Sequence, residues 1–432
     1  MNGDLFAPGY KPLPFWWERS PLTQRPDTPL PEKADVVVIG SGYTGLTAAI
    51  QTARGGRHTV VIEAEAIGIG CSTRNGGQAS TSLKPSYSML AEKYGPDLAY
   101  DLTKEGHNAL KWLGEYIEEE RIDADFRKVG RYYAAHSPGN FTKLAKSIEN
   151  PPKGLETDGY VVTKAEQPAE IDSPLYHGGI VLPRHASVDP GAYHKGLVGV
   201  AEAAGVSIVE HCRAHAIDGP KGDLTVRTAK GTIRAKNVIV ATNGYTTKTT
   251  AWHQRRVIPI GSYILATVPL EPELIRRLIP NDRVISDTRK LVVYYRTCPE
   301  RKRILFGGRV SISETDPTAA APALHAEMVR RFPDLAHTPI SHCWEGFVAY
   351  TFDEMPHLGE RDGVHYSMGY CGSGVSLSGY FGTKIGLQVL GRSEGDSPLT
   401  GLEFPTRPYY WGTPWFLAPS IRYYRWADER AA

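Results

Sequence analysis

The sequence has few cysteines and lacks any long hydrophobic segment. Its 432 residues include five cysteines, which are widely spaced and form no Cys-X-X-Cys pair: Cys71, Cys212, Cys298, Cys343 and Cys371. This pattern excludes a disulfide framework and a zinc site, and we expect no metal. No apolar run approaches the ~20 residues of a membrane-spanning helix. The proline-rich, charged residues 1–32 do not read as a secretory signal, so we expect a cytoplasmic protein without a membrane span.

An excess of charge of one sign is also missing. The chain has 49 basic and 47 acidic residues, for a net charge of +2. The net charge therefore creates no strong electrostatic field that would indicate a nucleic-acid partner. The one short basic run, Arg301-Lys302-Arg303, reads as a hairpin tip. The length predicts two packed domains or one large domain.

The clearest motif that is present is a glycine turn between a strand and a helix. Ala34–Ile39 is a β-branched run typical of a buried parallel strand, and helical spacing follows over Thr44–Arg54. The residues between them, 40–45, read Gly-Ser-Gly-Tyr-Thr-Gly. Such a turn brings the backbone and the helix N-terminus against a pyrophosphate. Glu63, at the tip of the next strand, is placed to accept hydrogen bonds from ribose hydroxyls and disfavours a 2′-phosphate.

Three further segments favour FAD over NAD, because an enzyme that binds a nicotinamide cofactor does not need so many glycine-rich or polar ligand-binding segments. They are the polar loop 72–78, the strand and small-residue turn 238–244, and a second glycine-rich helix start at 369–376. The positive end of that helix could stabilise negative charge on a reduced flavin. The expected cofactor-binding residues are Gly40, Gly42, Tyr43, Thr44, Gly45, Glu63, Ala64, Ser72, Thr73, Arg74, Asn75, Gly76, Gly77, Gln78, Ala214, Ala241, Thr242, Asn243, Gly346, Gly372, Ser373, Gly374, Val375 and Ser376.

The remaining periodicity predicts an α/β fold, α+β overall, in which a Rossmann-type FAD-binding domain is interwoven with a mixed-sheet substrate domain. We assign residues 33–105, 185–250 and 340–395 to the FAD-binding domain, with a parallel sheet. Residues 106–184 and 251–339 form the substrate domain, and 396–432 a C-terminal extension. The last helix is expected from Gly374 to about Leu390. Residues 1–32 form an irregular arm, whose Phe15-Trp16-Trp17 pins it to the body or, alternatively, contributes to gating or a dimer contact.

Together these motifs resemble the D-amino acid oxidase, glycine oxidase and sarcosine oxidase superfamily of flavoenzymes, and within it the γ-glutamylputrescine oxidoreductase group. The segments that carry the resemblance are 42–46, 67–68, 74–78, 226–231, 294–296, 306–308, 331–333, 344–346, 355–356 and 372–375. The resemblance implies hydride transfer from a carbon bonded to nitrogen to flavin N5. The imine product then hydrolyses, and oxygen or another acceptor reoxidises the flavin.

Three departures from the family pattern bear on the chemistry. Ser373 replaces a histidine that many relatives carry before the last helix. The tethering cysteine of sarcosine oxidases would fall near Gly346, so we expect non-covalent FAD, with Cys343 as an alternative tether. The lysine that promotes their oxygen reaction would fall near Leu305, and the γ-glutamylputrescine group lacks it as well.

On the substrate side we expect Tyr295, Arg296, Trp344, Tyr350 and Ser373 to serve catalysis. An arginine, Arg296 or Arg309, could clamp a substrate carboxylate, although a structural ion pair is an alternative for each. Trp344 and Tyr350 could form an aromatic wall or belong to the core, and His357 is read as structural.

The overall hypothesis is an FAD-dependent oxidase of a small amine or amino acid, with O2 as acceptor and a homodimer left open. The alternatives are a dehydrogenase that reduces a quinone or a partner protein, and a non-catalytic flavin-binding subunit.

Overall fold

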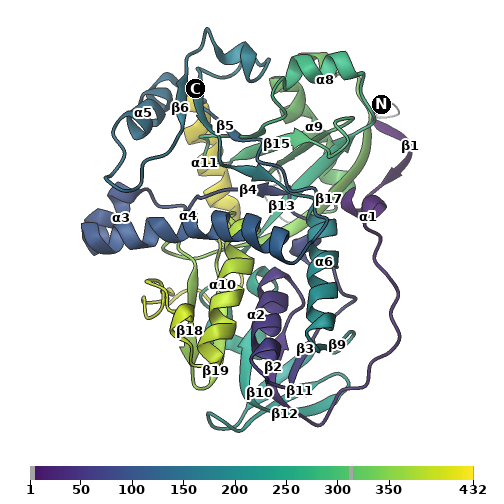
Figure 1. Ribbon diagram of the computed structural model, residues 1–432. Coiled ribbons are helices and arrows are strands. Elements are labelled where there is room, and N and C mark those ends of the chain that lie inside the picture. The colour runs from purple at the N-terminus through teal and green to yellow at the C-terminus, as the bar shows by residue number, and fades with distance from the viewer. Residues whose placement is uncertain (1–4, 311–314, 432) are drawn as a thin grey trace.

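The computed structural model describes residues 5–310 and 315–431, which fold around two large β-sheets. Figure 1 shows one sheet in the upper half of the molecule and the other in the lower half, with a long helix crossing between them. That helix, α4 (Pro96–Glu119), is continuous through residue 105, where the sequence predicted a domain boundary.

The lower, eight-stranded sheet contains the glycine turn predicted from the sequence. Its parallel strands are β2 (Lys33–Ile39), β3 (Thr59–Ile62), β9 (Ser207–Val209), β12 (Gly231–Val240) and β19 (Val364–Met368). The prediction of a parallel sheet was incomplete, because β10 (Ala214–Asp218), β11 (Leu224–Thr228) and β18 (His357–Arg361) pair antiparallel with their neighbours. These strands are hairpin partners, and short connections join strands antiparallel.

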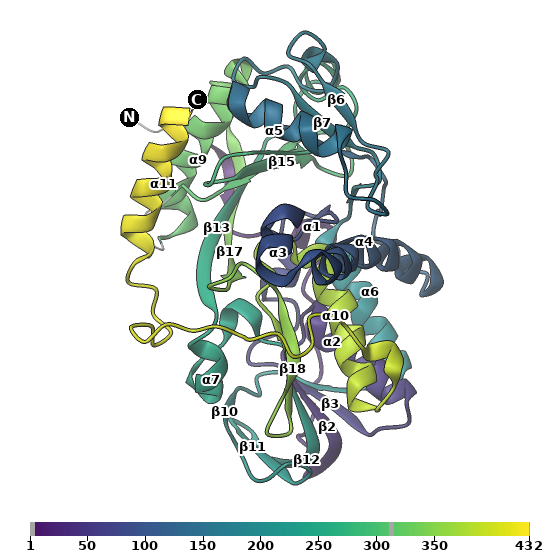
Figure 2. The same ribbon diagram turned by 90° about the vertical axis from the view of Figure 1, so that its left-hand side faces the viewer.

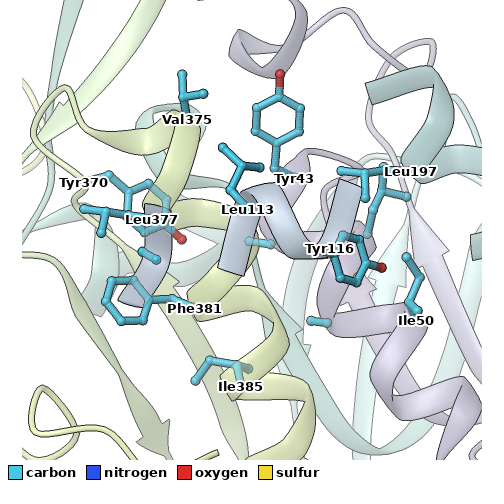
Figure 3. Close-up of a cluster of buried hydrophobic side chains, with 14 of the residues drawn as sticks. Tyr43, Ile50, Leu113, Tyr116, Leu197, Tyr370, Val375, Leu377, Phe381 and Ile385 are labelled. Carbon is cyan, nitrogen blue, oxygen red and sulfur yellow. The ribbon is translucent and has the colours of Figure 1, made fainter. Parts of the chain in front are cut away.

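Three helices cover one face of this sheet: α2 (Tyr43–Arg54), α6 (Pro190–Ala203) and α10 (Gly374–Val389). Their apolar faces share one core with α4. In Figure 3, side chains from all four helices converge in this core, including Ile50, Leu113, Leu197 and Phe381. The core fixes the N-terminal ends of α2 and α10 relative to each other.

The upper, nine-stranded sheet is mixed, as predicted for the substrate domain. Its order is β1-β17-β13-β16-β15-β14-β5-β7-β6, and only β1–β17 and β14–β5 pair in parallel. The strands are β1 (Phe6–Lys11), β5 (Arg131–Ala134), β6 (Tyr160–Val162), β7 (Gly179–Leu182), β13 (Ile258–Thr267), β14 (Val284–Asp287), β15 (Val293–Thr297), β16 (Ile304–Gly308) and β17 (Ile340–Tyr350).

Helices α8 (Pro272–Leu278) and α9 (Pro317–Arg331) share a core with one face of this sheet, and its other face is turned to the nucleotide-binding half. β17 pairs with β13 throughout, so residues 340–350 belong to this sheet and not to the FAD-binding segment 340–395 to which the sequence assigned them.

The N-terminal arm is anchored by its aromatic residues. Trp16 is fully buried and its indole N–H donates to the carbonyl of Asn75 at 2.9 Å, while Trp17 donates to the Thr73 hydroxyl at 3.0 Å. The prediction that these aromatics pin the arm to the body is confirmed. The prediction of an irregular arm was wrong, because β1 and a short helix, α1 (Trp16–Arg19), lie within it.

Smaller elements complete the chain: α3 (Tyr87–Tyr94), α5 (Pro138–Glu149), α7 (Ala251–Gln254), and the short paired strands β4 (Gln78–Ala79) and β8 (Ala186–Ser187). The predicted helix from Gly374 to about Leu390 is confirmed as α10, but it is not the last helix, because α11 (Leu417–Ala431) follows an extended segment seen in Figure 2. None of the helices within the described residues is both long and apolar enough to cross a membrane.

Candidate functional site

A cavity lies at the carboxyl ends of the parallel strands, where the glycine turn, the loop after β3 and the start of α10 meet. The predicted residues that line it are Gly40, Gly42, Tyr43, Thr44, Glu63, Ala64, Ser72, Asn75, Ala214, Ala241, Thr242, Asn243, Gly372, Gly374 and Val375. Further lining residues that the sequence did not single out include Ser41, Cys71, His194, Tyr245, Phe347 and Cys371. The edge formed by strand ends is where α/β proteins bind dinucleotides.

The glycine turn has the close packing that such a ligand requires. A Cβ atom added at Gly45 would lie 1.9 Å from the carbonyl oxygen of Gly40, so only glycine lets α2 pack against the turn. A Cβ at Gly42 would lie 2.9 Å from the Ser72 hydroxyl, at the cavity wall. The backbone is therefore open to a ligand at Gly42, while Gly45 serves packing.

Glu63 is held in one orientation at the tip of β3. One carboxylate oxygen accepts from the Ser41 backbone N–H at 2.9 Å and from its hydroxyl at 2.6 Å, and the other accepts from the Ala64 N–H at 2.7 Å. His194, on α6, is 2.8 Å from the Ser41 carbonyl and supports the same turn. A fixed carboxylate that keeps exposed surface at the cavity suits ribose hydroxyls, which are donors.

Two helix N-termini face the cavity without a cap from their own N-cap residue. Gly42 precedes α2 and Ser373 precedes α10, and neither makes a side-chain cap, although the Ser72 hydroxyl accepts from the Tyr43 N–H at 3.1 Å. By contrast, Ser137, Asp189 and Asp316 cap α5, α6 and α9. Uncapped N–H groups and the positive helix ends favour an anionic or electron-rich ligand.

The loop 71–78 is stabilised mainly by its own polar groups. Asn75 donates to the Ser72 carbonyl at 2.9 Å and accepts from the Gly77 N–H at 2.9 Å, while Arg74 donates to the carbonyls of Ile69 and Glu345. We expected Arg74 and Asn75 to offer donors to the cofactor, but these groups are used to hold the loop. Of the predicted residues in this loop, Thr73, Arg74, Gly76, Gly77 and Gln78 do not line the cavity.

Some of the remaining predicted cofactor residues line the cavity, and others hold the neighbouring loops in place. Asn243 accepts from the Gly369 N–H at 2.9 Å and so joins the turn after β12 to the start of α10. Ser376 donates to the Ser80 carbonyl at 2.6 Å and supports the loop after β4, and Ser373 does not line the cavity. A Cβ at Gly346 would meet Arg74 and Cys71, so Gly346 makes room for loop 71–78.

Three of the five predicted substrate-side residues, Tyr295, Arg296 and Trp344, are buried and do not line the cavity. Tyr295 points to the α9 side of the sheet, where its hydroxyl bonds to that of Tyr176 at 3.0 Å. Arg296 is 2% exposed and donates to the carbonyls of Gly77 and Val188 at 2.8 and 2.9 Å. Trp344 donates to the Arg74 carbonyl at 2.8 Å. Arg296 therefore has a structural role, because its N–H groups bond to backbone carbonyls. This replaces the expectation that Arg296 clamps a substrate carboxylate.

Two tyrosines, Tyr294 and Tyr350, lie on the face that is turned to the nucleotide-binding half, the same face as Arg296 and Trp344. Tyr294 is one residue from Tyr295 and so points to the opposite face, where its hydroxyl is 3.0 Å from that of Ser262. Tyr350 keeps exposed surface, and its hydroxyl is 4.0 Å from the position of a Cβ at Gly372, which lines the cavity. Burial raises the pKa of both tyrosines, so both hydroxyls stay neutral at pH 7.

Two other predicted residues have structural surroundings. His357 is buried, 3.1 Å from the carboxylate of Asp353, and stacks on Phe404, as the structural interpretation expected. Arg309 donates to the Gly261 carbonyl at 2.5 Å. No group of three or more His, Cys, Asp or Glu side chains among the described residues could hold a metal.

The two sheets and the cavity at the strand ends define an α/β fold of the dinucleotide-binding type. The family model for FAD dependent oxidoreductases matches residues 35–385, and the chain belongs to this family. It is 31% identical over 413 residues to the probable oxidoreductase OrdL of Rhizobium meliloti (strain 1021), covering 93% of each protein. It is 30% identical over 408 residues to γ-glutamylputrescine oxidoreductase of Escherichia coli (strain K12), covering 91% of this chain and 93% of the relative.

Solved structures agree on the fold. Glycine oxidase from Geobacillus kaustophilus has a TM-score of 0.73 at 17% identity, covering 88% of this chain and all of that one. L-Amino acid deaminase from Proteus vulgaris, with its specific insertion deleted, has a TM-score of 0.68 at 20% identity, covering 92% and 99%. The predicted fold class and family resemblance are confirmed, and the glycine turn, Glu63 and the N-termini of α2 and α10 fit FAD.

Proposed function

We propose that this FAD-dependent oxidoreductase oxidises the C–N bond of an amine or amino acid to the imine. The observation that carries the proposal is the proximity of Gly372, which lines the nucleotide cavity, to Tyr350 on the substrate-facing sheet, whose hydroxyl lies 4.0 Å from the position of a Cβ at Gly372. The E. coli relative, whose name specifies an amine substrate, supports the choice of C–N chemistry. FAD, when bound, supplies the hydride acceptor for this oxidation.

The residues of the chain then have distinct tasks. Glu63 binds the ribose hydroxyls, and the N-terminus of α2 receives the pyrophosphate. The N-terminus of α10 faces the flavin and favours negative charge there. Tyr294, Ser262 and Tyr350 present neutral hydroxyls, which can orient an amine and exclude water around the reacting carbon.

We further propose that FAD is bound non-covalently. Three thiols line the cavity: Cys71, Cys212 and Cys371. Burial raises the pKa of Cys71 to about 11 and that of Cys371 to about 12, so these two stay protonated and weakly nucleophilic. The Cys212 thiol donates to the Thr228 hydroxyl. Cys343 is buried in the core on the α9 side of the sheet, which removes the alternative tether. Acid precipitation tests this: the yellow colour is expected in the supernatant, and colour retained by the protein would disprove it.

We keep oxygen as the proposed electron acceptor. Leu305, at the position of the oxygen-activating lysine in sarcosine oxidases, is packed with Trp16 and Trp344, so any oxygen reaction proceeds without a cation at that position. The alternative is a dehydrogenase that reduces a quinone or a partner protein. A cytoplasmic location and a homodimer stay proposals that fractionation and light scattering can test.

The decisive experiment is anaerobic titration of the purified holoprotein with amines, amino acids and N-alkyl amino acids. Bleaching of the flavin absorbance identifies the substrate, and failure of every compound would favour a non-catalytic flavin-binding subunit. Rapid return of colour on admitting air supports the oxidase. Return of colour only after a quinone is added would favour the dehydrogenase.

A further inference from the structure

The C-terminal extension exposes a group of aromatic side chains, which we call the aromatic patch. Ten large hydrophobic side chains are exposed within residues 5–310 and 315–431, and six of them lie between residues 409 and 426. Trp411 is 69% exposed and Trp415 is 64% exposed, although tryptophan is usually well buried. Exposed apolar side chains that gather in one place mark interaction sites. The patch consists of Tyr409, Trp411, Trp415, Tyr423, Tyr424 and Trp426.

Other residues of the same segment hold it to the body of the protein. Ile421 and Asp428 of α11 are buried, and the Asp428 carboxylate accepts from the backbone N–H groups of residues 290 and 291 at 2.9 and 3.0 Å. Tyr423 and Trp426 lie on the opposite side of α11, because 3.6 residues make one helical turn. Figure 2 shows α11 and the extended segment before it along one outer edge of the molecule. The anchoring of α11 therefore fixes the patch as an outward surface.

Arginine side chains accompany the exposed rings. The Arg255 guanidinium lies 4.0 Å from the ring centre of Trp411, and the Arg430 guanidinium lies 4.5 Å from that of Trp426. Residues 405–431 contain four arginines and two acidic residues, one of which is the inward-facing Asp428, so their outward charge is positive. Among the residues that the structure describes, no carboxylate forms an ion pair with Arg255 or with those four arginines, which are Arg407, Arg422, Arg425 and Arg430.

The chemistry of the patch indicates what it binds. All of its exposed large hydrophobic side chains are tryptophan or tyrosine, the residues that prefer the headgroup level of a membrane. Negatively charged lipid phosphates lie at the same level, where the guanidinium groups stacked on Trp411 and Trp426 can meet them. A second copy of the chain fits less well, because a symmetric contact would bring the same arginines against each other.

We propose that the aromatic patch binds the surface of an anionic membrane, with α11 lying in the headgroup layer. Tyr423 and Trp426 enter the boundary between headgroups and acyl chains, while Arg422 and Arg430 bind lipid phosphates. Asp428 joins the docked helix to the loop between β14 and β15, so the substrate-facing sheet is held close to the membrane. The inference is independent of the proposed amine oxidation, because no residue of the patch lines the nucleotide cavity.

Co-sedimentation of the holoprotein with lipid vesicles tests the proposal. We expect the wild type to bind vesicles made of equal parts of phosphatidylcholine and phosphatidylglycerol, and to bind pure phosphatidylcholine at least about tenfold more weakly. Added salt should weaken the binding, because it screens the arginines. Brominated lipid should quench the tryptophan fluorescence of the wild type and quench that of Trp426→Phe less, because this variant lacks one of the docked indoles. A wild type that binds neither vesicle would overturn the proposal.

Matched substitutions separate the patch from the rest of the surface. Trp426→Ser should weaken binding to the anionic vesicles by at least about tenfold, and Arg422→Gln should weaken it by about fivefold. Two controls should leave the binding unchanged: Met89→Ser removes a side chain in α3 that is 57% exposed, and Arg276→Gln removes an exposed arginine in α8. All four positions are exposed, so thermal unfolding of the variants should match that of the wild type.

Other occupants of the patch give other results, and each of these would overturn the proposal. A contact between two copies of the chain would appear in light scattering as a dimer that Trp426→Ser converts to a monomer, without vesicle binding. An acidic protein partner would be indicated if the holoprotein bound immobilised polyglutamate through the patch and bound no vesicle. Equal binding to both kinds of vesicle would show that the arginines do not select anionic lipid. Vesicle binding that Trp426→Ser and Arg422→Gln retain in full would place the lipid-binding surface elsewhere.

Discussion

The carboxylate of Glu63 lies 2.6 Å from the hydroxyl of Ser41, across the turn that separates β2 from α2. This contact joins the tips of two parallel strands and fixes the orientation of an acidic side chain that lines the cavity. The backbone N–H of Ser41 reaches the same oxygen at 2.9 Å. The turn and the carboxylate are therefore one rigid unit before any ligand binds.

Replacing that carboxylate should weaken FAD binding selectively. We expect Glu63→Gln to raise the Kd for FAD by about 10- to 100-fold, because hydrogen bonds to a charged group contribute about 1.5–3 kcal/mol. Fluorescence quenching of FAD titrated with apoprotein measures this. Glu202→Gln, which removes an exposed partner of Arg25, is the control and should not alter the Kd. A Glu63→Gln protein with wild-type affinity would show that Glu63 does not bind the ribose.

Alanine substitution should change the free energy of unfolding in opposite directions at Gly45 and at Gly199. Gly45→Ala forces a methyl group against the Gly40 carbonyl and should lower the free energy of unfolding by about 1–3 kcal/mol, with loss of bound FAD. Gly199 is within α6 and its Cβ would meet nothing within 4 Å, so Gly199→Ala should add about 1 kcal/mol. Urea denaturation of the two apoproteins measures both changes. Similar stability changes would mean that the close contact at Gly45 is relieved by a shift of α2.

Substitutions at the neighbouring tyrosines Tyr294 and Tyr295 in β15 should affect different properties, the first activity and the second stability. Tyr294→Phe removes a hydroxyl from the substrate-facing side and should lower kcat/KM by about tenfold with little change in unfolding. Tyr295→Phe removes the bond to Tyr176 and should lower stability by about 1–2 kcal/mol with unchanged kinetics. Steady-state kinetics and thermal unfolding of both variants check this. The reverse pattern would restore Tyr295 as the substrate-side residue.

Buried histidines should make the protein sensitive to acid. Burial lowers the pKa of His253 to about 3 from an ordinary value of 6.5, with Arg256 and Arg361 adding repulsion. The folded state then binds fewer protons than the unfolded state between these values, so stability is lost as the pH falls from about 6.5 toward 3. The slope is at most about 1.4 kcal/mol per pH unit for one group.

His253→Phe should keep the ring contacts with Trp252 and Tyr366 and reduce this slope. Urea unfolding at pH 7 and pH 5 gives the comparison. His215→Gln, at an exposed position in β10, should behave as the wild type does. An unchanged slope in His253→Phe would assign the acid sensitivity to other groups.

The sequence predicted the nucleotide-binding unit well because its signals are local. A β-branched run, three glycines at fixed spacing and an acidic strand tip are each dictated by contacts within about 30 residues. The same holds for Ala241, Thr242 and Gly372, which end or begin buried elements and do line the cavity.

The substrate side was less predictable. Side chains alternate between the two faces of a strand, but the sequence does not show which set of alternate residues faces the site until the strand register is known. Tyr294 and Tyr295 are equally aromatic in the sequence, and pairing with β16 and β14 decides which one faces the site. Arg296 has the chemistry of a carboxylate clamp, yet the carbonyls of Gly77 and Val188 use its donors.

The sequence by itself thus determined the dinucleotide-binding unit with its glycine turn and Glu63, because short-range sterics and strand periodicity fix that unit. Only the tertiary structure decided which side chains of the nine-stranded sheet face the nucleotide-binding half. Those side chains come from β13, β15 and β17, and long-range strand pairing alone sets which of them share a face.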